Sequence, residues 1–93
     1  MLDTDRPRQV SGFQAADKES LRGELVLFNP ATQKILYSNH TGALIWGLCD
    51  GQRTIADIIQ LLNEAYPDSI PEIDAEVRET LSVLAEHGAI EWA

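Results

Sequence analysis

Histidine, cysteine and carboxylate side chains could act here as nucleophiles, general bases or metal ligands, but fifteen Asp and Glu residues would supply a pair by chance, so their number is no evidence of a site. The chain has one cysteine, Cys49, and two histidines, His40 and His87. A Cys–His pair needs an orienting third group and an oxyanion hole, and a zinc site needs several ligands at short spacing. There is no CxxC, HxxxH, GxGxxG or Walker pattern. We therefore predict a protein with no catalytic residues, no metal site and no cofactor, which means that it is not an enzyme.

The bulk composition is that of a single small globular domain. The 93 residues are 44% hydrophobic and 24% charged, which predicts a packed core. A formal charge of −8 argues against nucleic acid and against anionic lipid as partners. Residues 1–9 are polar and contain Pro7, so we expect a flexible N-terminal tail followed by one domain over residues 10–93.

Two features of the sequence favour a cytoplasmic location. The N-terminal MLDTDRPRQ lacks the apolar core of a signal peptide, and no apolar run approaches the ~20 residues needed to cross a bilayer. A single cysteine cannot form a disulfide within the chain. We therefore expect a reducing compartment.

A β-hairpin is predicted between residues 24 and 37. Two short apolar runs, ELVLF at 24–28 and ILY at 35–37, flank the turn sequence NPAT. Strand side chains alternate between two faces, so both faces of this hairpin carry apolar residues. A sheet backed by helices on one face should alternate apolar with polar. The second face or the free edge is therefore expected to be covered by the N-terminal segment, a second copy of the chain or a peptide partner.

Three helices are predicted after the hairpin. The first covers residues 39–49, with Asn39 or Thr41 as its cap, and ends at Asp50–Gly51; the second begins at the cap residue Thr54. The third begins near residues 71–72 and ends around His87, with Ile73, Val77, Leu81 and Leu84 as its buried stripe. Strands followed by helices indicate an α+β fold.

From Gly23 to its end, the chain resembles the PqqD-like family of peptide-binding proteins, also called RiPP recognition elements. The family has a strand that leads through an Asn and a Thr–Gly into a helix, then a DG-x-rT step and a last helix that ends in Gly. The matching residues are Tyr37, Asn39, Thr41, Gly42, Ile45, Trp46, Asp50, Gly51, Arg53, Thr54, Glu76, Val77, Leu81, Leu84, Gly88, Ala89 and Ile90. Ser38 and Thr80 depart from the pattern, because the family usually has Leu at the first position and an aromatic or aliphatic residue at the second.

The resemblance implies a winged-helix-like domain in which a small three-stranded antiparallel sheet is followed by three α-helices. It also implies a non-catalytic peptide chaperone. Such proteins bind the leader of a ribosomally made precursor peptide and present it to a modifying enzyme, often a radical SAM protein, in natural-product or PQQ-type cofactor biosynthesis. The leader adds as a strand and lies against the last helix. Carried onto this chain, the peptide-binding residues are Lys34, Ile35, Leu36, Tyr37, Ser38, Val77, Arg78, Leu81 and Ala85.

The charge of the last third of the chain predicts a property of the peptide. Residues 67–93 contain seven acidic residues and a single base, Arg78. If part of this charge borders the groove, the leader should carry Lys or Arg beside an apolar anchor, and its binding should weaken with salt.

Two other functions fit the predicted elements. A small structural domain could dimerise through a strand edge, which makes the chain a monomer or a homodimer depending on that contact. A winged-helix DNA-binding regulator would place the second helix in the major groove. Residues 54–66 contain no Lys or Arg, however, and only Arg53 lies beside them.

Overall fold

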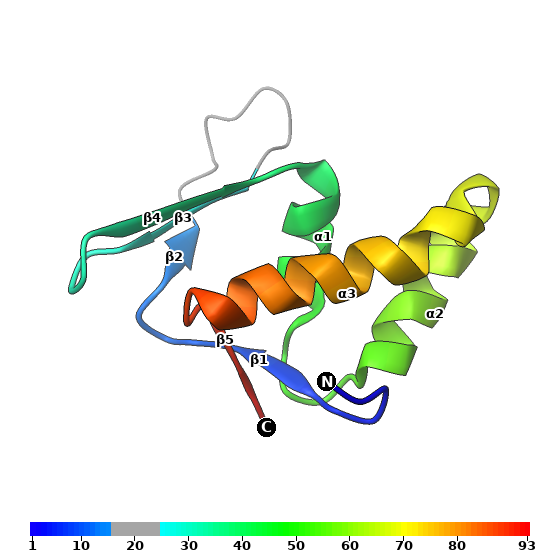
Figure 1. The fold of residues 1–93 in the computed structure, drawn as a ribbon, viewed down its shortest axis with the longest axis horizontal. Helices are drawn as coiled ribbons and strands as arrows, with labels where there is room; N and C mark the ends of the chain where they lie inside the picture. The colour runs from blue at the N-terminus through cyan, green and yellow to red at the C-terminus, as the bar shows by residue number, and fades with distance from the viewer. Residues whose placement is uncertain (16–24) are drawn as a thin grey trace.

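The structure, a computed structural model, describes residues 1–15 and 25–93; Gly23, where the family resemblance begins, lies outside these ranges. The described residues form a mixed α/β fold with three α-helices and two small antiparallel sheets (Figure 1), in agreement with the predicted α+β class. In chain order the elements are β1 (Pro7–Gln9), β2 (Gln14–Ala15), β3 (Leu25–Asn29), β4 (Lys34–Ser38), α1 (His40–Leu48), α2 (Ile55–Ala65), the 3-10 turn η1 (Pro67–Ser69), α3 (Ile70–Glu86) and β5 (Ile90–Trp92).

The larger sheet has the strand order β2-β3-β4, with β3 and β4 forming the predicted hairpin. At the turn, Asn29 Oδ1 accepts hydrogen bonds from the backbone N–H groups of residues 31 and 32, at 3.0 and 3.4 Å. Leu27 pairs with Leu36 in the register, and Leu27 is fully buried on the helix side. Tyr37 pairs with Val26 on the opposite face and is 75% exposed.

Local capping signals set the ends of the helices. Asn39 is the N-cap of α1 and its Oδ1 accepts from the N–H of Gly42 at 2.8 Å. Thr54 and Asp57 form a reciprocal capping box at the start of α2. Gly51 lies between the two helices with φ +79°, a backbone conformation that favours glycine. These findings confirm the predicted junctions.

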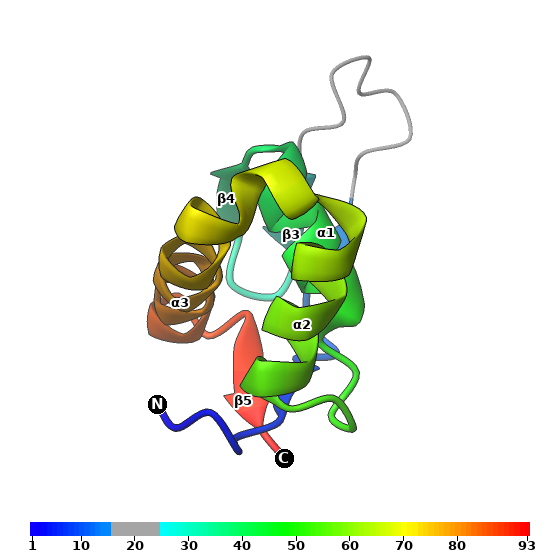
Figure 2. The ribbon, with the colours of Figure 1, turned by 90° about the vertical axis from the view of Figure 1, so that its right-hand side faces the viewer.

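The helices and the larger sheet bury a common core, in which α1 packs against β3 and β4, and α3 packs against α1 and α2. In Figure 1 α3 crosses in front of α1, and in Figure 2 α3 lies on one side with α1 and α2 on the other. Both views place the β2-β3-β4 sheet at one end of the molecule and the two termini at the other. The predicted stripe of α3 is buried, as are Ile45 and Trp46 of α1 and Ile55, Ile58 and Leu62 of α2, whereas Leu61 of α2 is 40% exposed. The core consists of Phe13, Leu27, Ile45, Trp46, Cys49, Ile55, Ile58, Leu62, Ile73, Val77, Leu81, Leu84, Ala89 and Ile90.

The N-terminal segment differs from the expected flexible tail. Residues 7–9 form β1, which pairs antiparallel with β5, and Pro7 is fully buried. The Pro7 carbonyl accepts from the N–H of Gly51 at 2.8 Å, and the N–H of Gln9 donates to the carbonyl of Cys49 at 3.1 Å. Closer to the N-terminus, backbone carbonyls accept from the first N–H groups of α2. Backbone hydrogen bonds hold this segment in place. Such bonds do not depend on the polar side chains from which a flexible tail was expected.

A search of the described helices for a membrane span found none that is both long enough and apolar enough.

Candidate peptide-binding site

β4 is an edge strand of the larger sheet. In the strand order β2-β3-β4, its inner side pairs with β3, and no described strand pairs with its outer side. An edge strand presents unpaired N–H and C=O groups that an additional strand can satisfy. The strand leads directly into the N-cap of α1, so its outer edge and the start of that helix form one continuous surface.

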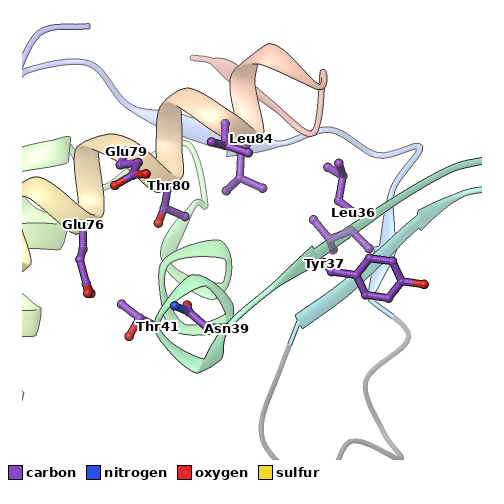
Figure 3. A pocket seen from close by; sticks show the side chains of 10 residues that line it. Leu36, Tyr37, Asn39, Thr41, Glu76, Glu79, Thr80 and Leu84 are labelled. Carbon is purple, nitrogen blue, oxygen red and sulfur yellow. The ribbon is translucent and has the colours of Figure 1, made fainter.

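A cleft of about 380 Å³ separates β4 from α3. Figure 3 shows side chains of α3 directed toward the start of α1 on one wall, and residues of β4 on the other. The cleft is lined by Leu27, Leu36, Tyr37, Asn39, Thr41, Glu76, Glu79, Thr80, Val83 and Leu84.

The lining of this cleft combines an apolar floor with an acidic border. Leu27 and Leu84 are buried beneath it, and Val83 is 45% exposed at its side. Glu76 and Glu79 contribute carboxylates from α3, while Lys and Arg are missing from the described lining. The cleft can therefore take apolar side chains of a ligand in its floor and attract positive charge at its border.

Of the five predicted residues of β4, two line the cleft and three lie elsewhere on the same strand. Leu36 and Tyr37 line the cleft itself, with the Tyr37 side chain extending away from α3 (Figure 3). Lys34, the first residue of the strand, is exposed, and Ile35 is 50% exposed. Ser38 is the last residue of β4 and pairs with Leu25 through its backbone. All of them belong to the strand with the open edge.

The predicted residues of α3 do not line the cleft. Val77 and Leu81 are 0% exposed and belong to the core. Ala85 is partly buried against that core. The Arg78 guanidinium binds the carboxylates of Asp74 and Asp3, each at 2.7 Å, and is not among the lining residues. These positions lie on the buried or opposite parts of the helix surface, not on the part that faces β4.

The residues of α3 that face β4 are one or two sequence positions away from the predicted ones. Glu76, Glu79, Thr80 and Val83 line the cleft. The sequence contained a usable signal for this offset. Because the stripe at 73, 77, 81 and 84 is the buried face, its residues can form at most the floor of a groove, as Leu84 does here, and the exposed walls must use the positions next to the stripe. Asn39 and Thr41 at the start of α1 were also missed as lining residues.

The three side chains of the most reactive types in the sequence, those of His40, His87 and Cys49, lie on different parts of the fold. His40 is the first residue of α1 and His87 is the C-cap of α3. The Cys49 thiol is buried and donates a hydrogen bond to the Ile45 carbonyl. Burial, with a smaller effect from the Asp50 carboxylate, raises the pKa of Cys49 to about 12. Within residues 1–15 and 25–93, no group of three or more His, Cys, Asp or Glu could hold a metal ion.

Known proteins were compared with the chain by sequence and by fold. A PqqA binding protein of Pseudomonas syringae pv. syringae (strain B728a) is 34% identical over 73 residues, which cover 78% of this chain and 73% of the relative. One of Pseudomonas fluorescens (strain SBW25) is 30% identical over 82 residues, which cover 87% of this chain and 86% of the relative. The solved structure described as TbiB1 in complex with the TbiA(beta) leader peptide superimposes with a TM-score of 0.71 at 20% identity, covering 90% of this chain and 94% of that one.

The match to a family model spans most of the chain. Residues 24–90 match the model of coenzyme PQQ synthesis protein D. That range runs from the start of the hairpin to the first residue of β5, so it contains β4, the cleft and all three helices. On this match and on the similarity of the relatives, the chain belongs to the PqqD family.

Proposed function

We propose that this protein binds the leader of a ribosomally synthesised precursor peptide and presents that peptide to a modifying enzyme. The observation that carries the proposal is the open edge of β4 beside the cleft to α3. Membership of the PqqD family supports it, as do relatives that are named for binding PqqA. The setting is natural-product or PQQ-type cofactor biosynthesis, and the modifying enzyme is of the radical SAM type or another tailoring class.

The peptide binds by adding a strand to the outer edge of β4. Backbone hydrogen bonds supply affinity without regard to side chains, and alternate side chains of the added strand fix its register. Leu36 faces the core side of the sheet, and Ile35 and Tyr37 face the other side. Side chains of the peptide on the Leu36 side therefore enter the cleft, and those on the other side extend the apolar surface of Ile35 and Tyr37.

The binding residues that we propose combine the predicted strand with a revised face of α3. The strand contributes Lys34, Ile35, Leu36, Tyr37 and Ser38, the first four of them exposed or half-buried. Val77 and Leu81 support the site from below, because they are buried. The cleft side of α3 and α1 is formed by Asn39, Thr41, Glu76, Glu79, Thr80 and Val83.

The protein acts as a chaperone and not as a catalyst in this proposal. Strand addition needs no reactive side chain, and the Cys49 thiol is buried with its pKa raised to about 12. We also propose that the chain is one winged-helix-like peptide-binding domain that works in the cytoplasm, where a free cysteine stays reduced. The hairpin corresponds to the wing.

The experiment uses a probe peptide selected from a displayed library of random peptides on the immobilised protein. Titration of the probe into ¹⁵N-labelled protein should shift the backbone amides of residues 34–38 and of α3 around Thr80. N-methylation of alternate backbone amides of the probe should weaken binding at the positions that donate to β4. Amide shifts confined to other elements, or tolerance of every N-methyl group, would contradict strand addition.

A second function, dimerisation through the same edge, is favoured by the exposed apolar side chains of Ile35 and Tyr37. Sedimentation of the protein alone distinguishes the two. A monomer that binds the probe with one-to-one stoichiometry supports peptide capture. A tight dimer that the probe does not dissociate would support association instead.

A further inference from the structure

A second cleft of about 320 Å³ lies next to the first, between the start of α1, the turn η1 and the first turns of α3. Thr41 and Glu76 line both clefts. The two are therefore neighbouring parts of one surface that begins at β4 and continues toward the N-terminal end of α3. The lining of the second cleft is His40, Thr41, Leu44, Leu62, Tyr66, Asp68, Ser69, Glu72, Ile73 and Glu76.

The second cleft has an apolar base and an acidic border. Leu62 and Ile73 are nearly fully buried beneath it, and Tyr66 is 44% exposed at its side. Asp68, Glu72 and Glu76 border it, and its described lining includes neither Lys nor Arg. Apolar atoms of a ligand would be desolvated at the base, and a cation would be attracted at the border.

The direction of β4 indicates which part of a bound peptide reaches this cleft. The strand runs toward α1, since Ser38 is followed by the N-cap Asn39. Every strand pair in the described sheets is antiparallel, and antiparallel pairs are the commoner kind. A peptide that adds antiparallel to β4 begins beside Ser38 and ends beside Lys34. The residues that precede the added strand then pass Thr41 and arrive at the second cleft.

We propose that the second cleft holds a large apolar side chain of the peptide, located N-terminal to the strand-adding segment and next to a Lys or Arg. This inference rests on the proposed function, because it assumes a peptide on β4. It makes recognition bipartite. The edge of β4 accepts many sequences through their backbones, and the second cleft selects peptides that carry the anchor and its basic neighbour.

The acidic border gives the choice of cation its physical basis. Glu72 and Glu76 are exposed carboxylates, one turn apart on α3, so a Lys or Arg beside the anchor can approach both. The cation of this helix is Arg78, and it is already bound to Asp74 and Asp3. No described salt bridge involves Glu72 or Glu76. A basic residue of the peptide would therefore not have to displace a described salt bridge in order to bind Glu72 or Glu76.

Two variants of the second cleft and two controls test the proposal. Ser69→Trp fills the cleft without loss of a capping bond, because Ser69 makes none with its side chain. Glu72→Lys reverses the charge of the border. Ser82→Trp and Glu86→Lys place the same changes at exposed positions of α3 outside both clefts. Thermal unfolding of each variant verifies that it folds.

The measurement compares each library-selected probe with a version shortened at its N-terminus to the strand-adding segment. We expect selected probes to be enriched in an apolar residue next to Lys or Arg before that segment. The shortened probe should bind about tenfold more weakly than the full one, and Ser69→Trp should reduce the affinity of the full probe to that of the shortened one. Glu72→Lys should abolish the preference for the basic residue, and both controls should behave as the unchanged protein.

Equal affinity of full and shortened probes, or unchanged affinity in Ser69→Trp, would overturn the bipartite model. Strand addition is judged separately, since the shortened probe must still shift the amides of β4. If neither probe shifts those amides, the proposed function fails and the second cleft fails with it.

Discussion

At the residue scale, neighbouring positions on α3 have opposite roles. Leu81 is fully buried in the core, and Val83 is 45% exposed beside the cleft. Successive residues of an α-helix are 100° apart around its axis, so a shift of one or two positions moves a side chain from the core to the groove. Substitutions at these two sites should therefore separate stability from peptide binding.

Leu81→Ala should lower the free energy of unfolding by about 2–5 kcal/mol, because it leaves a cavity in the core. Val83→Asp should leave the free energy of unfolding within about 0.5 kcal/mol and weaken the probe about tenfold by placing a charge where apolar contact is expected. Ser82→Asp, at an exposed position outside the cleft, is the control. Urea unfolding and fluorescence anisotropy measure the two effects. A destabilised Val83→Asp with normal affinity would contradict the assignment of Val83 to the cleft.

Cys49 should be unreactive in the folded protein. Its thiol is buried and its pKa is raised to about 12, so very little thiolate exists at neutral pH. Reaction with a thiol reagent should be slow in native buffer and rapid in denaturant. Equal rates in the two conditions would mean that the thiol is accessible and would reopen the question of its chemistry.

Asp50 should contribute to the pH dependence of stability. Its Oδ1 accepts from the N–H groups of Gln52 and Arg53, each at 2.9 Å, and its Oδ2 lies 2.6 Å from the Arg53 guanidinium. The hydrogen bond from the Arg53 backbone is the main cause that holds the pKa of Asp50 below its ordinary value of 3.8. A lowered folded-state pKa stabilises the protein above the unfolded-state pKa, and this contribution is lost as the pH falls through the folded-state value.

The variant Asp50→Asn keeps an oxygen that can accept the backbone hydrogen bonds but cannot titrate. Its stability should lie below that of the unchanged protein near neutral pH, and the difference should shrink as the pH falls below about 4. Urea unfolding at a series of pH values measures this. A difference that stays constant with pH would show that the charge of Asp50 contributes nothing.

At the element scale, β1 links the two ends of the chain to the junction between α1 and α2. It pairs with β5, buries Pro7 and exchanges backbone hydrogen bonds with Cys49 and Gly51. Removal of residues 1–9 should therefore lower the free energy of unfolding by about 3 kcal/mol or more, at about 1 kcal/mol for each lost hydrogen bond plus the exposure of apolar surface. Chemical unfolding of the truncated chain measures it. Unchanged stability would restore the picture of a flexible tail.

The predicted elements with local signals were the ones that the structure confirmed. Asn39, Thr54 and Gly51 mark helix ends through contacts within a few residues, and the 3.6-residue stripe of α3 is visible in the sequence. β1 could not be predicted in this way. It is defined by pairing with β5 at the far end of the chain, and its own residues Pro7, Arg8 and Gln9 have no strand pattern.

The same distinction applies to the candidate site. The strand Lys34–Ser38 was identified from its apolar run and from the family resemblance, and the structure places it at a sheet edge. The α3 residues that the family resemblance implies include Val77 and Leu81, which belong to the helix's buried stripe and lie in the core. The contribution of Asn39 and Thr41 depends on how the start of α1 packs beside α3, which is a tertiary feature.

At the scale of the whole molecule, charge should govern the strength of peptide binding. The chain has a formal charge of −8, and acidic side chains border both clefts. Raising the ionic strength from about 0.05 to about 0.5 M shortens the range of electrostatic attraction severalfold. The affinity of a basic probe should fall several-fold over this range, as measured by anisotropy. The control is a probe in which each Lys is replaced by norleucine and each Arg by citrulline. It should bind with little dependence on salt. Equal salt dependence of both probes would contradict an electrostatic contribution from the clefts.

Strand addition to β4 is the central claim, and intermolecular nuclear Overhauser effects test it most directly. The measurement uses isotope-labelled protein with an unlabelled probe peptide. We predict a regular series of backbone contacts between the probe and residues 34–38, in antiparallel register, with side-chain contacts from the probe to Thr80 and Val83. A probe whose contacts lie only on the helices, with none to the backbone of β4, would contradict the account.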